Sequence, residues 1–374
     1  MENSKMGVIE AVFFVLAVIT NKIILNFPKE IVLWSGNSAW LNVIYISIIV
    51  GVLAIIVCNL FSKFGGYDIL DISHYLGGNF LKIALGTILI VIPLFNSIDL
   101  VRDFSEDLKL IYFNTSPLIF ISLFFVIAAI IANKAGFTAI FKTCTIIMPI
   151  VMISIVVILF SHLKNFEIER LLPIFGNGVN ETFISGLSNI SVHSGFLFLF
   201  FLMPFLKNTE KYKKIGIIAW ILSSLYLLLS VLSLLLVFAS STVTKEPLSL
   251  YLIVRTIEYG TFFQRVDALF ILLWILSTMT YLSVLMFMAL YIFKKIFNTE
   301  DRKVLASCFG MLILALSLIP ENTVILTTIQ ETFFKYYFLI TIFILCPIIL
   351  YLASRKKKKE LQNNKPITKN IPII

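Results

Sequence analysis

Apolar stretches of about 20 residues, the length that crosses the hydrocarbon core of a bilayer as a helix, alternate with short polar segments along most of the chain. The pattern therefore predicts a bundle of membrane-spanning helices. The first and eighth stretches are long, so we expect those helices to be tilted or interrupted. The ten predicted spans lie approximately at residues 7–34, 38–61, 80–101, 115–133, 139–162, 183–205, 215–239, 264–293, 303–320 and 333–353.

Composition supports an all-α integral membrane protein. Of the 374 residues, 59% are hydrophobic and 14% are charged, whereas a soluble domain has about 45–50% apolar and about 25% charged residues. The net charge is +9, but the basic residues are dispersed between apolar spans, which argues against a nucleic-acid partner. Membrane lipid is the expected surrounding. No enzyme, metal or cofactor motif is found, so we expect neither catalysis nor a cofactor.

The distribution of lysine and arginine predicts the orientation of the bundle. With the N-terminus in the cytoplasm, 20 of the 30 basic residues fall in inner segments and 9 in outer segments. This excess predicts cytoplasmic termini at both ends. The basic run at 355–359 is either a topology anchor or a lipid-binding patch, and we favour the anchor. A transmembrane domain is expected over 1–359, and the polar tail 360–374 is expected to be disordered.

Ten spans divide into two halves of five, approximately 7–162 and 183–353. Pro28 and Pro204 lie near the ends of the first span of each half, and Pro149 and Pro347 lie in the last spans. Two halves with an odd number of spans enter the membrane from opposite sides, which gives an inverted repeat. Transporters built in this way bind their ligand near the midplane, where the first helix of each half is unwound.

Polar residues interrupt the first and sixth spans at corresponding places. The first carries Thr20, Asn21 and Lys22, and the sixth carries the polar segment 188–195. A broken helix would free backbone groups to face a cavity. Alternatively, such side chains hydrogen-bond between packed helices. Since both interruptions occur at equivalent positions, we favour the cavity and expect the first span to unwind at Thr20 and Asn21.

The candidate ligand-binding residues come from these interruptions and from the third span. Lys22 faces the cavity in one interpretation, which we favour, and in the other its flexible stem carries the charge toward the outer surface. Asp99 shares a helix face with Asn96 and is a candidate to offer negative charge to a ligand ammonium. The alternative, which we favour, is a solvated acid paired with Arg102. The candidates are Thr20, Asn21, Lys22, Asn96, Asn189, Ser191, His193, Ser194 and Gly195.

Several segments resemble the GerAB-type spore germination permeases. The most specific is the start of the eighth span, where Phe263, Arg265 and Asp267 match the family pattern Phe-x-Arg-hydrophobic-acid. Similar segments are 102–106 with 115–117, 171–178 and 198–208. The chain departs from the family at the first interruption, where glycine is common, and in the sixth span, where a frequent glutamate is absent.

The resemblance implies the amino acid–polyamine–organocation superfamily and a LeuT-like fold of five plus five helices with interrupted helices 1 and 6. It also implies the B subunit of a nutrient germinant receptor in the inner membrane of an endospore. The implied partners are a receptor A subunit, a lipoprotein C subunit and a small nutrient such as an amino acid. Near the outer mouth, charged residues are expected to hold a gate or a partner subunit; they are Arg102, Glu106, Glu258, Arg265 and Asp267.

The function expected from these features is nutrient sensing that helps to trigger germination. A proton-coupled amino acid transporter is the alternative, because it needs the same fold and pocket. A scaffold that assembles the other subunits without binding a ligand is the third possibility.

Overall fold

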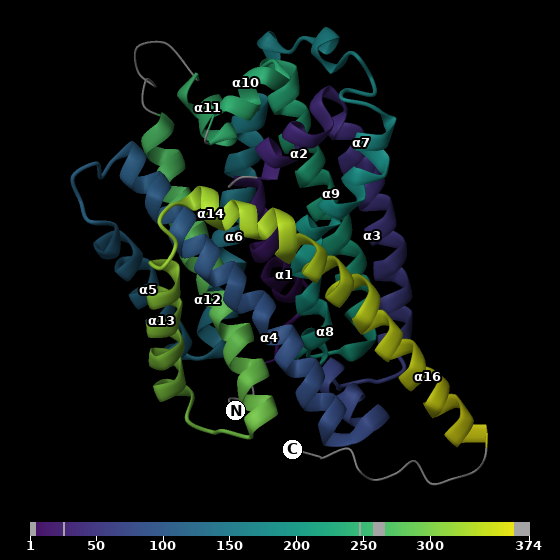
Figure 1. The fold of residues 1–374 in the computed structure, drawn as a ribbon. Helices are drawn as coiled ribbons and strands as arrows, with labels where there is room; N and C mark the ends of the chain where they lie inside the picture. Colours follow the sequence, from purple (N-terminus) through teal and green to yellow (C-terminus); the bar gives the residue numbers. More distant parts are fainter. Residues whose placement is uncertain (1–4, 25–26, 247, 257–265, 363–374) are drawn as a thin grey trace.

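The computed structural model describes residues 5–24, 27–246, 248–256 and 266–362, and the regular elements within these ranges are helices (Figure 1). The first half contains α1 (Val8–Ile24), α2 (Phe27–Ser35), α3 (Ala39–Phe61), α4 (Ile69–Ile111), α5 (Leu118–Ala135) and α6 (Phe137–Phe160). The second contains α7 (Val179–Phe183), η4 (Ser185–Phe198), α8 (Leu199–Leu202), η5 (Met203–Phe205), α9 (Tyr212–Val237), α10 (Ser240–Lys245), α11 (Ser249–Arg255), α12 (Val266–Phe297), α13 (Arg302–Ser317), α14 (Thr323–Ile329), η7 (Gln330–Phe334), α15 (Lys335–Phe338), η8 (Leu339–Leu345) and α16 (Cys346–Gln362).

The first span is helical where the sequence analysis predicted it to unwind. Thr20, Asn21 and Lys22 belong to α1, which the structure describes as helix from Val8 to Ile24. Residues 25–26, between α1 and α2, lie outside the described residues. The prediction of unwinding at Thr20 and Asn21 is therefore wrong.

The sixth span is interrupted where predicted. After the short α7, the 14 residues of η4 form a 3₁₀-like segment with a non-helical residue at His193, and α8 follows. A 3₁₀ segment of this length is unusual, since runs beyond 3–4 residues are uncommon. This confirms the predicted interruption of the sixth span.

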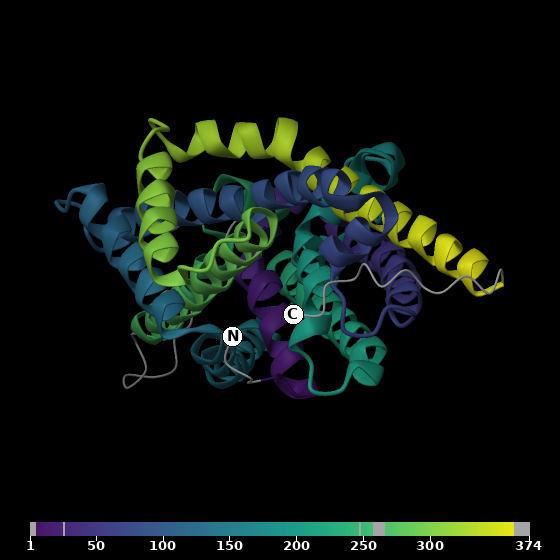
Figure 2. The ribbon, with the colours of Figure 1, turned by 90° about the horizontal axis from the view of Figure 1, so that it is seen from below.

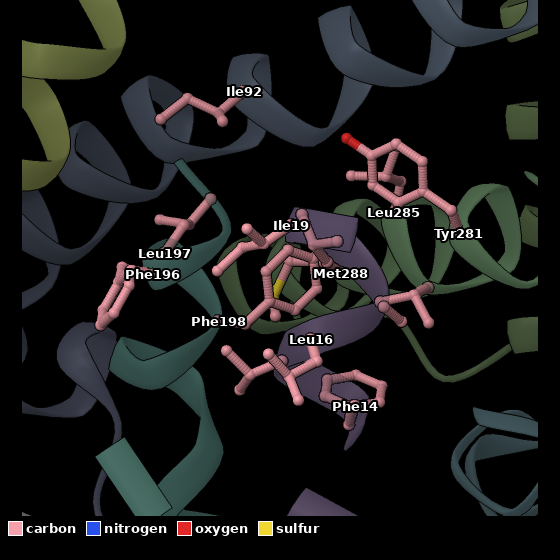
Figure 3. Packing of buried hydrophobic residues seen from close by; sticks show 14 of the residues in the cluster. Phe14, Leu16, Ile19, Ile92, Phe196, Leu197, Phe198, Tyr281, Leu285 and Met288 are labelled. Atoms are coloured by element: carbon pink, nitrogen blue, oxygen red, sulfur yellow. The ribbon is translucent and has the colours of Figure 1, made fainter. Parts of the chain in front are cut away.

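The buried centre of the bundle is α1. Its residues from Ala11 to Asn21 are buried except Phe13, and α1 packs against α6, α9, α12 and η4. Figure 3 shows Phe14, Leu16 and Ile19 of this helix facing side chains of η4 and α12. The ring of Phe14 contacts that of Phe198 edge-on, with centroids 5.7 Å apart. A helix that is apolar all round belongs in a protein interior.

The outer helices expose apolar stripes. Ile146, Ile150, Ile153 and Val157 of α6 are 52–66% exposed at helical spacing, which is the face that a lipid-contacting helix presents. Seen from below, α5 and α13 lie at one side of the central α1, and α3 and α16 lie at the other (Figure 2).

Eight helical segments in the described ranges are long and apolar enough to cross a membrane. α1 and α13 are shorter, with 17 and 16 residues. The number of ten spans, as distinct from the fold, therefore stays a prediction.

The last span is longer than predicted. π-helical segments, η7 and η8, divide it, and α16 continues to Gln362, so residues 360–362 are helical rather than part of a disordered tail. The rest of that tail, 363–374, lies outside the described residues. Lys356 in the basic run donates to the carbonyl of Tyr75 at 2.7 Å, and the Lys357 amine lies 5.0 Å from the ring of Phe64. Part of the run is thus packed against the protein.

Candidate functional site

A cavity of about 60 Å³ lies where both interrupted spans meet α4, α12 and the last span. Ionisable and amide side chains dominate its walls, although the surrounding spans are apolar. The lining residues are Lys22, Phe27, Glu30, Ile31, Asn96, Asp99, Leu100, Asp103, Asn189, Ser191, Val192, Tyr281, Gln330, Glu331 and Lys335.

Four of the nine predicted ligand-binding residues line this cavity: Lys22, Asn96, Asn189 and Ser191. Asn189 is also fixed from behind, since its amide nitrogen donates to the side-chain oxygen of Asn42 at 3.0 Å. This bond joins η4 to α3 and holds Asn189 in place.

Lys22 reaches the second interrupted span directly. Its Nζ donates to Ser194 Oγ at 2.7 Å and lies 5.8 Å from the centroid of the Phe338 ring. In the described part of the chain, Lys22 forms no ion pair within 4.0 Å. Ser194 does not line the cavity itself but holds the lysine that does. The bond thus joins the last turns of α1 to η4.

Thr20 and Asn21 are buried away from the cavity, with exposed fractions of 2% and 0%. The Asn21 amide donates to the carbonyl of Ala17 at 3.0 Å and to that of Ser277 at 3.2 Å. This second bond ties α1 to α12. The structure thus gives Asn21 the alternative role weighed above, hydrogen bonding between packed helices.

His193 and Gly195 also lie outside the cavity lining. His193 is fully buried beside Phe196, with ring centroids 5.8 Å apart. Gly195 allows η4 to approach α1 closely: a Cβ there would lie 2.7 Å from Ile19 Cγ1 and 3.1 Å from Val18 Cγ1. The close backbone approach expected at Gly195 is present, and its partner is the core helix.

Replacing Gly195 with alanine is expected to lower stability by about 1–3 kcal/mol, the usual cost of forcing an extra methyl group into a packed core. The matched control is Gly65→Ala, because the nearest atom to a Cβ at that position is 3.8 Å away. Thermal unfolding of the purified protein in detergent measures both variants. Equal unfolding midpoints for the two would contradict the close packing.

The sequence analysis missed most of the charged wall. Glu30, Asp103, Glu331 and Lys335 line the cavity and were not candidates. Asp99 was interpreted as a solvated acid paired with Arg102, but it lines the cavity. The available signal was the spacing of Asp99 and Asp103, which puts two acids on one face of an apolar helix.

One pair in this wall is already neutralised. Lys335 Nζ lies 2.9 Å from Glu331 Oε2, and the lysine is only 6% exposed. The same amine lies 5.3 Å from the ring of Trp34 in α2. Lys335 therefore holds the last span against α2 and has little freedom to bind a ligand.

The residues expected at a gate or partner contact divide into two places. Arg102 pairs with Glu106 at 2.5 Å and donates to the carbonyl of Glu321 at 2.8 Å, so it joins α4 to the turn after α13. Asp267 accepts from the Tyr112 hydroxyl at 3.3 Å. Glu258 and Arg265 lie outside the described residues.

The chain is similar to two curated proteins of Bacillus subtilis (strain 168). Spore germination protein B2 is 22% identical over 255 residues, which cover 67% of this chain and 68% of that protein. Spore germination protein KB is 23% identical over 276 residues, covering 71% of this chain and 72% of that protein.

Two solved structures share the fold. MhsT in complex with L-phenylalanine has a TM-score of 0.67 at 15% identity, covering 91% of this chain and 88% of the other. Mhp1 in an inward-facing conformation has a TM-score of 0.61 at 12% identity, covering 94% and 78%. Both support the LeuT-like arrangement of the helices.

Residues 5–325, most of the chain, match the spore permease family, which is described as "Spore germination protein". The chain is therefore an integral membrane protein that belongs to the spore permease family of germination proteins.

Proposed function

We propose that this chain is the nutrient-binding membrane subunit of a germinant receptor and that the nutrient is a small amino acid. One observation supports this proposal above the others: an amine and carboxylates face a single cavity between the interrupted spans. Lys22 comes from α1 and Asp99 from α4. An amino acid carries a carboxylate for the first and an ammonium for the second.

The family supports the setting of this activity. Spore germination proteins B2 and KB are similar along two thirds or more of their length, and MhsT, which shares the fold, was solved with an amino acid bound. We therefore place the chain in the inner membrane of a spore with both termini cytoplasmic. Receptor A and C subunits are its proposed partners, with membrane lipid around it.

Transport is the second candidate, because the cavity holds several ionisable groups that a proton-coupled amino acid transporter would use. Two measurements on the purified full chain separate the candidates. Thermal unfolding with each of the common amino acids tests binding, since a ligand of the folded state raises the unfolding midpoint. Uptake of radiolabelled alanine into proteoliposomes tests transport.

We expect stabilisation by at least one small amino acid and no concentrative uptake. Uptake driven by a proton gradient would replace the receptor with the transporter. If no amino acid changes the unfolding midpoint, the nutrient-binding role is wrong and the scaffold role takes its place.

A further inference from the structure

The charges around the cavity do not balance. Four carboxylates line it, from Glu30, Asp99, Asp103 and Glu331, but only two amines do, from Lys22 and Lys335. Glu331 and Lys335 neutralise each other at 2.9 Å. Glu30 and Asp99 then share Lys22 as the remaining amine of the lining, and this lysine donates to Ser194. Charges enclosed in a membrane are costly unless they are compensated, so the cavity favours a positively charged group.

Two polar groups of the α4–α12 wall face the cavity, Asp99 and Tyr281. Among the described residues, Asp99 Oδ1 is buried without a hydrogen bond. Tyr281 is only 2% exposed. Figure 3 shows the Tyr281 hydroxyl pointing from α12 toward α4, the helix that carries Asp99. Buried polar groups are nearly always hydrogen-bonded, so each such exception requires an explanation.

A third acceptor lies one turn before Asp99. The amide nitrogen of Asn96 donates to the carbonyl of Ile92 at 2.9 Å, which leaves the amide oxygen as an acceptor. Asn96 is 8% exposed and lines the cavity. The α4–α12 wall therefore offers a carboxylate, a phenol oxygen and an amide oxygen. A primary ammonium has three N–H donors, one for each.

We propose that this wall is an ammonium site and that the ammonium of the ligand, rather than its carboxylate, dominates binding. This inference rests on the proposed function and adds the chemical group that is recognised. Lys22 is the partner for a ligand carboxylate, but it already donates to Ser194. A ligand carboxylate therefore exchanges one hydrogen bond of Lys22 for another, whereas the ammonium meets Asp99 Oδ1, which has no hydrogen-bond partner among the described residues.

The test uses three molecules of the same heavy-atom count: L-alanine, L-lactate and L-alaninamide. Lactate replaces the ammonium of alanine with a hydroxyl, and alaninamide replaces the carboxylate with a neutral amide. Dissociation constants come from the ligand-dependent shift of the unfolding midpoint of the purified full chain. We expect lactate to bind about 30-fold or more weakly than alanine, and alaninamide to bind within about tenfold of alanine, because a hydrogen bond to a charged group is the stronger contact.

Asp99→Asn carries the site-specific prediction. This variant should bind alanine about as weakly as the unaltered protein binds lactate, and it should lose the preference for alanine over lactate. Asp301→Asn is the matched control, since Asp301 is exposed at the start of α13 and its side chain makes no capping hydrogen bond. If Asp99→Asn is not recovered in folded form, Tyr281→Phe removes one acceptor and should weaken alanine more than lactate.

The outcomes separate this inference from the function on which it rests. If alanine binds and lactate binds equally well, the ammonium site is wrong and nutrient binding stands. An unchanged preference in both Asp99→Asn and Tyr281→Phe also overturns the site. If no amino acid binds, both proposals fail together.

Discussion

Replacing Lys295 with methionine is expected to destabilise the protein by about 3–5 kcal/mol, the cost of leaving a buried charge without its partner. The Lys295 amine contacts Asp68 and also lies 2.6 Å from Asp71 Oδ2. Asp68 is fully buried and also accepts from the Tyr291 hydroxyl at 2.6 Å. Methionine keeps the apolar stem of the lysine but removes the only cation that pairs with Asp68 in the described part of the chain.

Asp68 makes this loss more severe because it also starts a helix. Its side chain accepts from the backbone N–H groups of Leu70 at 2.9 Å and Asp71 at 3.0 Å, which caps α4. The same α4 carries Asn96, Asp99 and Asp103 beyond a kink at Gly77 and Gly78. The pairing also connects α12 to the segment that joins α3 to α4.

The neighbouring lysine provides the control. Lys294 is also a lysine of α12. Within the described residues, its amine donates to a backbone carbonyl, that of Glu300, at an exposed position and a distance of 3.0 Å. Lys294→Met should therefore change the unfolding midpoint in detergent only slightly. The double variant Asp68→Asn with Lys295→Met should recover part of the loss, because the unpaired charge is gone. A Lys295→Met midpoint equal to that of Lys294→Met would show that the buried pair contributes little.

The length and apolarity of the spans made the architecture predictable from the sequence. The sixth span was correctly predicted to be interrupted. In a continuous helix, the polar residues of 188–195 would lie on every face, and apolar neighbours could not satisfy all of them. The predicted unwinding at Thr20 and Asn21 was wrong because polar side chains were taken as its signal. A polar side chain can be satisfied without breaking the helix, as the Asn21 amide is by the carbonyls of Ala17 and Ser277.

The site was harder to predict because its walls come from distant parts of the chain. Lys22, Asn96 and Ser191 stood out as polar residues within apolar spans. Glu30 and Lys335, by contrast, lie within a few residues of the ends of their predicted spans, where charges that flank a span are common. Lys335 lines the cavity directly after π-helical residues 330–334, and π segments often occur at functional sites. Periodicity does not reveal such a segment, so these residues required the assembled structure.

The bond between Lys22 and Ser194 suggests how ligand binding is transmitted. It is a direct polar contact between the last turns of α1 and η4, the two interrupted spans. A ligand carboxylate that binds Lys22 competes with Ser194 for the same amine. Occupancy of the cavity and the contact between the two spans are therefore linked. A ligand shifts the equilibrium between two conformations only if it binds one of them more tightly than the other.

Lys22→Met tests this role of the lysine. In the proposed receptor, the variant should require about tenfold or more alanine for the same response, since a charge-assisted hydrogen bond to the ligand carboxylate is lost. The response to alaninamide should change little, because that molecule has no carboxylate for Lys22 to bind. The alanine response would then fall to the level of the alaninamide response. These four measurements form a double-mutant cycle between the lysine and the carboxylate.

The cycle distinguishes ligand binding from a purely structural lysine. If Lys22 only holds Ser194, methionine should weaken alanine and alaninamide by the same factor, and Ser194→Ala should do the same. If the Lys22 charge instead lies toward the outer surface, methionine should fill the same space and leave both responses unaltered. The measurement is germination of spores that carry the variant, over a series of ligand concentrations and with the amount of the protein checked in the same membranes. Only a loss that is selective for alanine places the carboxylate of the nutrient on Lys22.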